Sequence, residues 1–513
     1  MKIIYLIKRN QDFIKVFLFC VFSCLSFGYS FKLVHSISLF LILIVVRSFT
    51  SRGYKSLIIL IGFFSSAYLP VALTYGSPDY NAIANILYAS KSESLEFLKA
   101  IPWFYYVTPL MGVVLTLMAF NVKIGKVKYR GWIILYIIIY LFSPSVKAYM
   151  KTGALPLFSN GLPIIKASSE AVSNYLTFVE QSAFLKQQMS LPDRWVPQKT
   201  SADYQLYILV IGESVRSDYM QAYGFKIKNT PFMSSASGVT FTNYISAASS
   251  TVMSLLNSLT LRINEQPDSS SNIVSLANKA GFSTYWYSNQ GMIGEGETPV
   301  SVIAMNAESV SFIKKGEYQQ NKYVPDIRML PQIRWAISEN KPVKLIVIHL
   351  IGSHSRACSR TNEKYSTFSQ SKEISCYIES IAQTDKLLAD VADMAKASGK
   401  SWSMMYFADH GLEFSDKDTQ YARLIHGDKF KQNYRVPMFI TASDSHERKT
   451  VDRPRSALNF LSLFSQWTGI KDKLINSDCN MMANVPCNNQ DTVIKFDQSK
   501  VYFSSLAQDS TAH

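Results

Sequence analysis

The sequence of 513 residues lacks internal repeats and low-complexity tracts, and none of its six cysteines forms a Cys-x-x-Cys pair. The absence of repeats argues against a solenoid or other repeat architecture. The missing Cys-x-x-Cys spacing argues against the usual cysteine-based zinc cluster. Charged residues are also scarce, at 17%. Few of them fall inside the apolar segments of the first 150 residues, which argues against an ion or solute path there.

Apolar residues are instead concentrated in five segments near the N-terminus. Each is close to the roughly 20 residues that a helix needs to cross a bilayer, and we predict spans at 11–29, 34–50, 56–75, 102–120 and 131–149. A cleaved signal peptide is the alternative for the first segment, because Lys2, Lys8 and Arg9 precede it. No small-residue cleavage site follows, so we expect an anchor and a transmembrane domain of about five helices over residues 1–150.

Basic residues lie at the start of the chain and in the turns after the second and fourth segments. Because positively charged loops stay in the cytoplasm, this distribution places the N-terminus inside. With five spans, everything after about residue 150 then lies outside. The same distribution accounts for part of the net charge of +15, so the charge gives little support to a nucleic-acid partner.

The cysteines divide between these two parts of the chain. Two of them, at positions 20 and 24, lie in the first span, where packing is their expected role. The other four fall in the external part, an even number in an oxidising compartment. The local pairs Cys358–Cys376 and Cys479–Cys487 are the simplest of the three possible connectivities.

Beyond the spans the pattern changes twice. Residues 151–202 are predicted to be a linker with helices at the membrane surface, because 171–191 shows apolar residues at helical spacing. An ordinary packing helix is the alternative there. After residue 203, short apolar runs alternate with helical stretches, and we predict strands at 207–211, 283–287, 345–348, 404–407 and 436–440. Continuous apolar runs are typical of strands buried on both faces, so residues 203–513 are predicted to form an α/β domain.

Three of these strands lead into residues that bind metals. Glu213 follows the first, His349 and then His354 follow the third, and Asp409 and His410 follow the fourth. The carboxyl ends of strands in an open α/β sheet meet along one edge, so we expect these side chains to converge. Each residue alone has a common structural explanation as a cap, a surface charge or a core histidine. Together, carboxylates and imidazoles make a donor set suited to Zn²⁺.

A small, hydroxyl-rich turn at 246–251 leads into a predicted helix that ends near Leu259. A plain N-cap is the common explanation for a hydroxyl at such a position. The same position can hold an anion through free backbone N–H groups. A metal-bound hydroxyl on Thr251 would be a competent nucleophile towards phosphorus. His426 is a further histidine beside a strand end and a glycine.

These residues occur in short motifs whose order resembles that of the phosphoethanolamine transferases, inner-membrane enzymes of the alkaline phosphatase/sulfatase superfamily. The motifs are Gly212-Glu213-Ser214, the Thr251 turn, the stretch from His349 to His354, Asp409-His410-Gly411 and Ile425-His426-Gly427. Five N-terminal spans and a periplasmic α/β domain are also that family's architecture, so the resemblance covers the whole chain. Stretches at 229–232, 287–291 and 464–470 resemble the members that act on osmoregulated periplasmic glucans.

The resemblance implies roles for individual residues. The zinc ligands that it implies are Glu213, Thr251, Asp409 and His410, and it implies that Thr251 is also the nucleophile. It implies that His354 and His426 hold the phosphoryl group or a second zinc ion. The further substrate-binding residues that it implies are Asn85, Glu93, Asn289 and His349. A turn-stabilising role is the alternative for Asn289 and for Gln290. Ala89 departs from the family, because many relatives have Thr at that place. No lysine follows Asn289-Gln290, unlike in many lipid A-modifying relatives, which favours a glucan acceptor.

The implied reaction has two steps and uses phosphatidylethanolamine as the donor. Thr251 takes the phosphoethanolamine group, diacylglycerol leaves with a proton from His354 or His426, and a sugar hydroxyl then accepts the group. The implied cofactor is one or two Zn²⁺ ions, and we expect a monomer in the inner membrane with its catalytic domain in the periplasm. The alternatives are a lipid A or lipopolysaccharide core acceptor, a phosphoglycerol transferase, a phosphatase, and a non-catalytic membrane sensor or transporter. The missing Cys-x-Pro-x-Arg run argues against a sulfatase.

Overall fold

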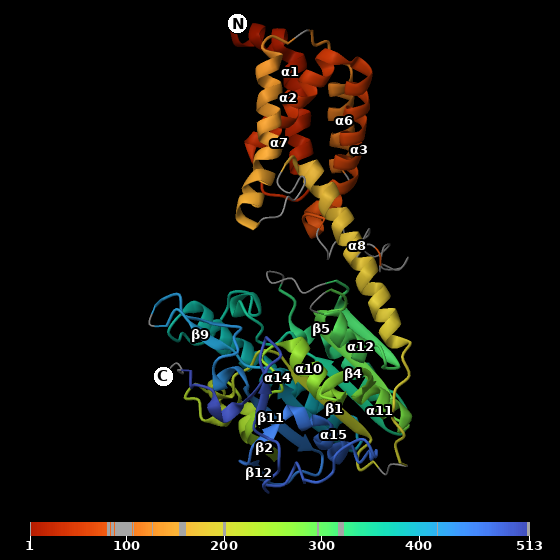
Figure 1. Cartoon of the computed structure of the whole chain (residues 1–513), viewed down its shortest axis with the longest axis vertical. Helices are drawn as coiled ribbons and strands as arrows, with labels where there is room; N and C mark the ends of the chain where they lie inside the picture. The colour runs from red at the N-terminus through yellow and green to blue at the C-terminus, as the bar shows by residue number, and fades with distance from the viewer. Residues whose placement is uncertain are drawn as a thin grey trace. The chain divides into compact units, whose positions relative to one another are not determined.

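The computed structural model of the chain describes residues 2–78, 83, 87, 105, 107–125, 127–152, 161–198, 202–294, 297–316, 323–417 and 419–509. The chain forms two compact units, Met1–Glu180 and Gln181–His513 (Figure 1). Helix α8 (Pro163–Met189) belongs to the predicted linker region and runs across the boundary between them. The first unit is helical, and the second is built around a large β-sheet.

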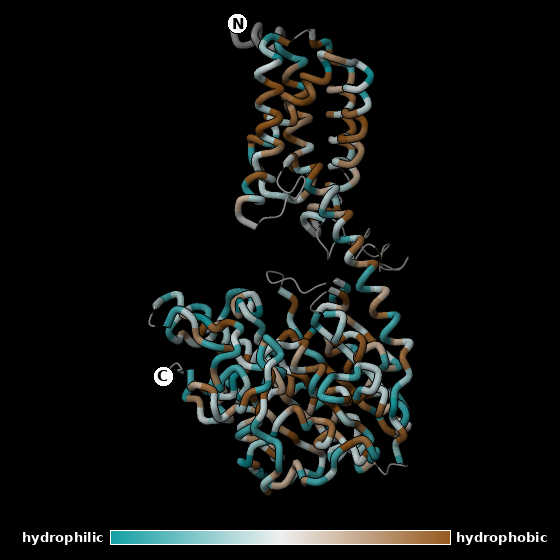
Figure 2. The backbone as a smooth tube through the Cα atoms, viewed as in Figure 1, coloured by the Kyte–Doolittle hydropathy of each residue, from teal (hydrophilic) through white to brown (hydrophobic). Residues whose placement is uncertain are grey.

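The helices of the first unit are apolar along most of their length (Figure 2). They are α1 (Lys2–Leu25), α2 (Leu33–Phe49), α3 (Ser51–Tyr75), α6 (Val107–Phe120) and α7 (Arg130–Thr152). Each predicted span overlaps one of these helices. Within the described residues, Ser51–Leu73 and Arg130–Lys147 are long and apolar enough to cross a membrane, whereas α2 and α6 are shorter apolar helices. The five-span topology therefore stays a prediction.

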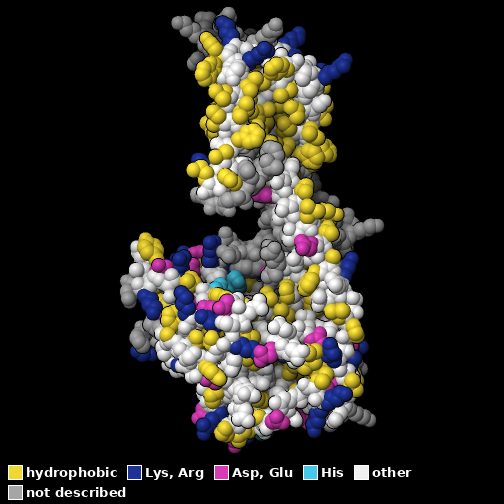
Figure 3. All heavy atoms as spheres, in the orientation of Figure 1, with side chains coloured by type: hydrophobic (Ala, Val, Ile, Leu, Met, Phe, Trp, Pro, Cys, Tyr) yellow, Lys and Arg dark blue, Asp and Glu magenta, His cyan; other side chains and the backbone are white. Residues whose placement is uncertain are grey.

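Small residues let α3 and α6 approach each other closely. A Cβ added to Gly62 would lie 2.2 Å from Thr116 Oγ1, and one added to Gly112 would lie 2.1 Å from Ser66 Oγ. Such small-residue contacts are typical of helix pairs in membranes. Large apolar side chains point outward, including Leu117 at 64% exposed, and hydrophobic side chains cover much of this unit's visible surface (Figure 3). An apolar surface of this extent marks a face that lipid or another apolar partner covers.

The second unit contains a nine-stranded sheet of order β12-β2-β11-β8-β1-β7-β5-β6, with β13 paired to β2. Its strands are β1 (Leu206–Gly212), β2 (Gly238–Ile245), β5 (Ser283–Gly291), β6 (Ser309–Lys314), β7 (Lys344–His349), β8 (Trp402–Ala408), β11 (Arg435–Ala442), β12 (Arg448–Val451) and β13 (Arg455–Ser456). Strands β8, β1, β7, β5 and β6 are parallel, and β11 runs antiparallel to β8 and β2. Every residue of β1, β7 and β8 is buried, so the α/β prediction and the five predicted strands are confirmed.

Helices flank this sheet, and smaller hairpins extend from it. The helices are α9 (Pro231–Ser235), α10 (Thr251–Leu259), α11 (Ile273–Lys279), α12 (Thr298–Ala304), α13 (Leu330–Ser338), α14 (Lys372–Ala397) and α15 (Phe460–Thr468). The hairpins are β3 (Thr260–Ile263) with β4 (Gln266–Asn272), β9 (Glu413–Ser415) with β10 (Arg423–Ile425), and β14 (Thr492–Ile494) with β15 (Lys500–Tyr502). The long helix α14 begins where Ser371 accepts a hydrogen bond from the Ile374 N–H, an N-cap that the sequence encodes locally. Helices α13 and α14 contact each other, while α10 contacts α12 and α15.

Both predicted disulfides are present. Cys358 pairs with Cys376 and Cys479 pairs with Cys487, each across a short separation in the chain. The two cysteines of α1 are free and buried. The local connectivity that the sequence favoured is therefore confirmed.

Candidate active site

The strand register brings the predicted metal ligands together. Strand β1 lies between β7 and β8 in the sheet, and Gly212 is paired with Ala408. Glu213 and Asp409 therefore each come one residue beyond the end of neighbouring parallel strands, and the Asp409 N–H donates to the Gly212 carbonyl at 3.1 Å. This is the sheet edge where ligands are bound in open α/β folds.

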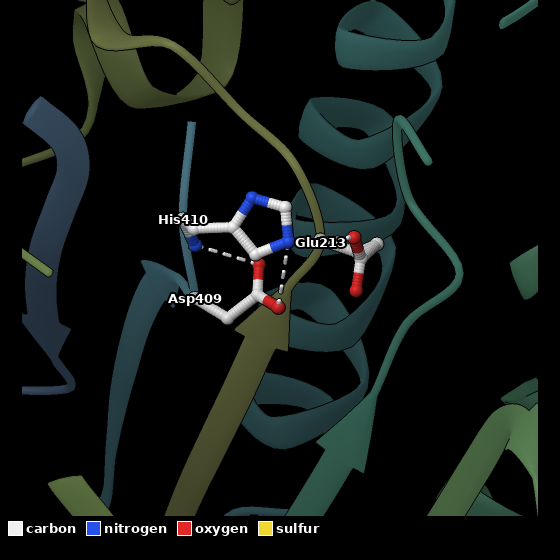
Figure 4. Close-up of side chains that lie close together, drawn as sticks. All are labelled: Glu213, Asp409 and His410. Carbon is white, nitrogen blue, oxygen red and sulfur yellow. Dashed lines mark hydrogen bonds and ion pairs between the residues drawn. The ribbon is translucent and has the colours of Figure 1, made fainter. Parts of the chain in front are cut away.

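Three buried side chains converge at this edge (Figure 4). Glu213, Asp409 and His410 are each at most 1% exposed, and one ligand atom from each lies within 4.8 Å of the others. His410 Nε2 lies 3.4 Å from Glu213 Oε1 and 3.6 Å from Asp409 Oδ2. His410 Nδ1 lies 2.8 Å from the Gly411 carbonyl, which leaves Nε2 facing the carboxylates. Two carboxylates and one imidazole nitrogen fit the donor set of a Zn²⁺ ion.

The electrostatics of the three residues are those of a site that a cation would stabilise. Burial, and then the neighbouring Glu213 carboxylate, raise the pKa of Asp409 to about 7. Burial also acts to raise the pKa of Glu213, but the hydrogen bond and charge of His410 hold it well below its usual range. Burial acts to lower the pKa of His410, yet Asp409 and Glu213 raise it to about 9. In this state the imidazolium offsets part of the carboxylate charge, and a divalent cation would do so in its place.

Thr251 adds a fourth oxygen to the cluster. It is the first residue of α10, behind the N-cap residue Ser250. Its hydroxyl donates to Glu213 Oε2 at 2.9 Å and lies 3.4 Å from His410 Nε2. The position also places Thr251 at the positive end of the helix dipole, beside first-turn N–H groups that have no partner within the helix. Ser254 of the same helix donates to the Asp409 carbonyl at 2.6 Å, which ties α10 to the end of β8.

Two histidines lie between the buried cluster and solvent. The ring centroids of His426 and His410 are 5.0 Å apart, and those of His426 and His354 are 5.5 Å apart. His354 is half-buried and His426 is exposed; histidine side chains are visible on the face shown in Figure 3. Burial lowers the pKa of His354. The structure thus brings His354 and His426 to the solvent-facing side of the cluster.

The other predicted substrate-binding residues lie elsewhere or outside the described residues. His349 is buried, with Nδ1 3.3 Å from Ser288 Oγ, and burial lowers its pKa to about 4. Asn289 is fully buried, and its side-chain nitrogen donates to the Val324 carbonyl and to Asp326 Oδ1. The amide of Asn289 is therefore engaged with protein groups, as in the turn-stabilising alternative. Asn85, Glu93 and Ala89 lie outside the described residues.

Two close partners of Glu213 were not assigned to it from the sequence. Gln290 Nε2 donates to Glu213 Oε2 at 3.1 Å, and the Ser214 hydroxyl donates to Glu213 Oε1. Ser214 has a positive φ of 58°, an uncommon conformation outside glycine that is typical of functional turns. Both residues belong to motifs that the sequence singled out, but neither motif says where its side chain points.

Comparison with known proteins finds related sequences. Residues 205–470 match the Sulfatase family. The chain is 36% identical over 460 residues to the phosphoethanolamine transferase OpgE of Escherichia coli, covering 88% of this chain and 87% of that protein. It is 23% identical over 292 residues to the phosphoethanolamine transferase EptC of Escherichia coli, covering 51% of this chain and 50% of that one.

A solved structure shares the fold of the second unit. It is the C-terminal periplasmic domain of EptC from Escherichia coli in complex with Zn, with a TM-score of 0.52 at 19% identity, and the match covers 62% of this chain and 98% of that one. The fold and the matched region define a sulfatase-family domain. The chain belongs to the phosphoethanolamine transferases of that family, and it is an enzyme.

Proposed function

We propose that this enzyme transfers phosphoethanolamine from phosphatidylethanolamine to a sugar hydroxyl of osmoregulated periplasmic glucans. The observation that carries the proposal is the Thr251 hydroxyl, 2.9 Å from the Glu213 carboxylate at the start of α10. This contact supports a nucleophilic role for Thr251, because the hydroxyl lies beside metal-type ligands and beside helix N–H groups that can hold a phosphoryl oxygen. The absence of a lysine after Asn289-Gln290 favours the glucan acceptor over lipid A.

The proposed roles of the three parts of the chain follow from the use of a lipid donor. Residues 1–150 are the membrane anchor of about five helices, residues 151–202 are a linker with membrane-surface helices, and residues 203–513 are the catalytic domain in the periplasm. The exposed apolar side chains of α8 support the surface-helix assignment, because they recur at helical spacing. They are Val172, Tyr175, Leu176 and Val179. We propose that the enzyme works as a monomer in the inner membrane.

Zinc is the cofactor that these residues fit. Glu213, Thr251, Asp409 and His410 would hold one ion, and His354 and His426 would hold the phosphoryl group or a second ion. When bound, zinc supplies positive charge that lowers the pKa of the Thr251 hydroxyl and offsets the charge that develops on phosphorus. The solved EptC domain with zinc supports this choice of metal.

In the first step Thr251 Oγ1 attacks the phosphorus of the donor lipid. Its proton passes to Glu213 Oε2, which already accepts the hydrogen bond from this hydroxyl. The bond from phosphorus to the diacylglycerol oxygen breaks, and that oxygen takes a proton from His354 or His426. The negative charge of the bound phosphodiester favours the protonated ring of either histidine. A phosphoethanolamine–Thr251 intermediate remains. In the second step the acceptor hydroxyl gives its proton to the same histidine and attacks phosphorus. The bond from phosphorus to Thr251 Oγ1 breaks, and Thr251 regains its proton from Glu213.

The test uses the purified full chain in detergent with phosphatidylethanolamine and periplasmic glucans. Mass spectrometry follows the phosphoethanolamine increment on Thr251 and on the glucans, and a lipid assay follows diacylglycerol release. We expect Thr251→Ala to lower transfer by about a thousandfold or more, as losing a covalent nucleophile does, and Thr251→Ser to keep partial activity. Thr260→Ala is the matched control, because the Thr260 hydroxyl lies at the other end of α10 and donates to the Leu256 carbonyl.

The outcomes separate the parts of the proposal. An active Thr251→Ala variant would rule out the covalent intermediate. An increment on lipid A or core sugars, in place of glucans, would leave the transfer chemistry intact and refute the acceptor. Release of free phosphoethanolamine to water, with no acceptor modified, would make the enzyme a hydrolase.

A further inference from the structure

The end of β5 carries two amide side chains that face the protein interior. Asn289 is fully buried and Gln290 is 5% exposed. Strand β5 is parallel to β7, with Ser288 paired to His349. The two amides therefore lie beside the residues that follow β7, at the sheet edge that carries the metal-type ligands.

Gln290 contacts the residues that follow two neighbouring strands, β1 and β7. Its side-chain nitrogen donates to Glu213 Oε2 at 3.1 Å and to the Leu350 carbonyl at 2.9 Å. Glu213 Oε2 is also the oxygen that accepts the Thr251 hydroxyl, while Ser214 donates to the other oxygen. Each carboxylate oxygen of Glu213 thus has a donor in the protein that sets its orientation.

Asn289 acts on the neighbouring loop. It donates to Asp326 Oδ1 at 2.8 Å, and Asp326 accepts the backbone N–H groups of Ile351 and Gly352 at 2.9 and 3.0 Å. Gly352 has a φ of +44°, and a Cβ on it would lie 3.1 Å from the backbone nitrogen and carbonyl oxygen of Glu213. The hydrogen bonds to Asp326 therefore hold the loop that leads to His354 close to the backbone of Glu213.

We propose that Gln290 is a positioning residue that acts through Glu213. This inference rests on the proposed role of Glu213 as a metal ligand. Gln290 keeps Glu213 Oε2 directed at Thr251 and limits rotation of the carboxylate, so that metal and nucleophile meet in one geometry. A neutral amide suits this task, because it donates a hydrogen bond without adding a positive charge that would compete with the metal. Partners that orient a metal ligand in this way commonly contribute 10- to 100-fold to affinity or activity, an order-of-magnitude range.

The test compares Gln290→Met with a matched control in the full chain. Methionine keeps the length of the side chain and removes both N–H bonds. Gln466→Met is the control, because the Gln466 amide bonds the Cys479 carbonyl and the Met481 N–H, neither of which belongs to the cluster. Gln290→Asn is the second variant, since it keeps an amide but is too short by one methylene to reach Glu213. The readouts are the zinc Kd by chelator competition, kcat and KM for the lipid donor, and the Tm of the zinc-free protein.

We expect both Gln290 variants to weaken zinc binding by about 10- to 100-fold and to lower kcat, with KM for the lipid donor unchanged. Gln466→Met should lower Tm and leave the zinc Kd and kcat at wild-type values. If both Gln290 variants keep the zinc affinity and kcat of the wild type while Glu213→Gln loses zinc, the role of Gln290 is refuted. The metal assignment of Glu213 then still stands. If Glu213→Gln itself binds zinc like the wild type, the metal assignment under the proposed function falls, and this inference falls with it.

Discussion

Replacing Asp509, near the end of the chain, with alanine removes one of the carboxylate partners of the buried Arg216. The side chains of Arg216 and Asp509 are both 0% exposed, with Arg216 Nη1 2.7 Å from Asp509 Oδ2. The same oxygen accepts the Phe414 N–H at 2.8 Å, so it also anchors the start of the hairpin that leads to His426. Asp218 remains as a second partner of Arg216, with Oδ2 2.7 Å from Nη2.

The magnitude follows from these contacts. Removing one member of a buried ion pair costs about 3–5 kcal/mol, and an orphaned backbone N–H adds about 1–3 kcal/mol. Because Arg216 keeps Asp218, the lower end of both ranges applies, and we expect Asp509→Ala to lower the free energy of unfolding by about 4 kcal/mol. In a domain of this size that corresponds to a fall in Tm of roughly 5–10 °C.

The sign of the pH dependence follows from the carboxyl group. Burial acts to raise the pKa of Asp509, but the charge of Arg216 and the hydrogen bonds from the Phe414 N–H, Lys417 and Arg216 together hold the pKa below its usual value. A depressed folded-state pKa contributes stability above the unfolded-state value of about 3.9, and this stability is lost as pH falls through the folded value. The difference between wild type and Asp509→Ala should therefore be full at pH 7 and shrink below about pH 4.

Thermal unfolding of the full chain in detergent, followed at pH 7 and at acidic pH, measures both effects. Asp444→Ala is the control, because Asp444 is exposed and accepts one hydrogen bond, from the Tyr204 hydroxyl; its cost should be below about 0.5 kcal/mol. A cost below about 1 kcal/mol for Asp509→Ala would refute the reasoning, as would a difference that grows on acidification.

Three further predictions follow from local geometry. Gly352→Ala should cost about 1–2 kcal/mol from its positive φ and weaken zinc binding, because its Cβ would press on Glu213 at 3.1 Å. Gly399→Ala is the control, because Gly399 has a φ of +69° and open space around it; it should lower stability through backbone strain and leave zinc binding unchanged. Equal zinc affinities in the two variants would contradict the predicted contact with Glu213. Replacing Cys358 and Cys376 together by serine should cost about 3 kcal/mol, as expected for a loop of this length, seen as a lower Tm measured without reductant, so that the Cys479–Cys487 disulfide stays intact. Removing metal with a chelator should abolish transfer and lower Tm, and added zinc should restore both; full activity after chelation would exclude a metal-dependent reaction.

Much of the second unit follows from local sequence pattern. The continuous apolar runs predicted β1, β5, β7, β8 and β11, because a strand covered on both faces has no polar side to alternate with. The metal-type ligands were recognisable because they directly follow such runs. The disulfides were predictable because each closes a short loop. In the first unit the predicted spans overlap helices, since apolar composition is itself the signal.

Other features were decided by tertiary structure. The order of the strands, and the antiparallel β11 next to β8, depend on pairings between distant segments. At strand ends the sequence does not specify which way a side chain points, since backbone direction changes there. His349 and Asn289 therefore ended up buried behind the cluster, while Gln290 bonds Glu213 across 77 positions of sequence. Residue type and strand pattern determined which groups this protein has for its chemistry; the packing of separate strands decided which of them meet, because hydrogen bonds between distant residues form only in the folded sheet.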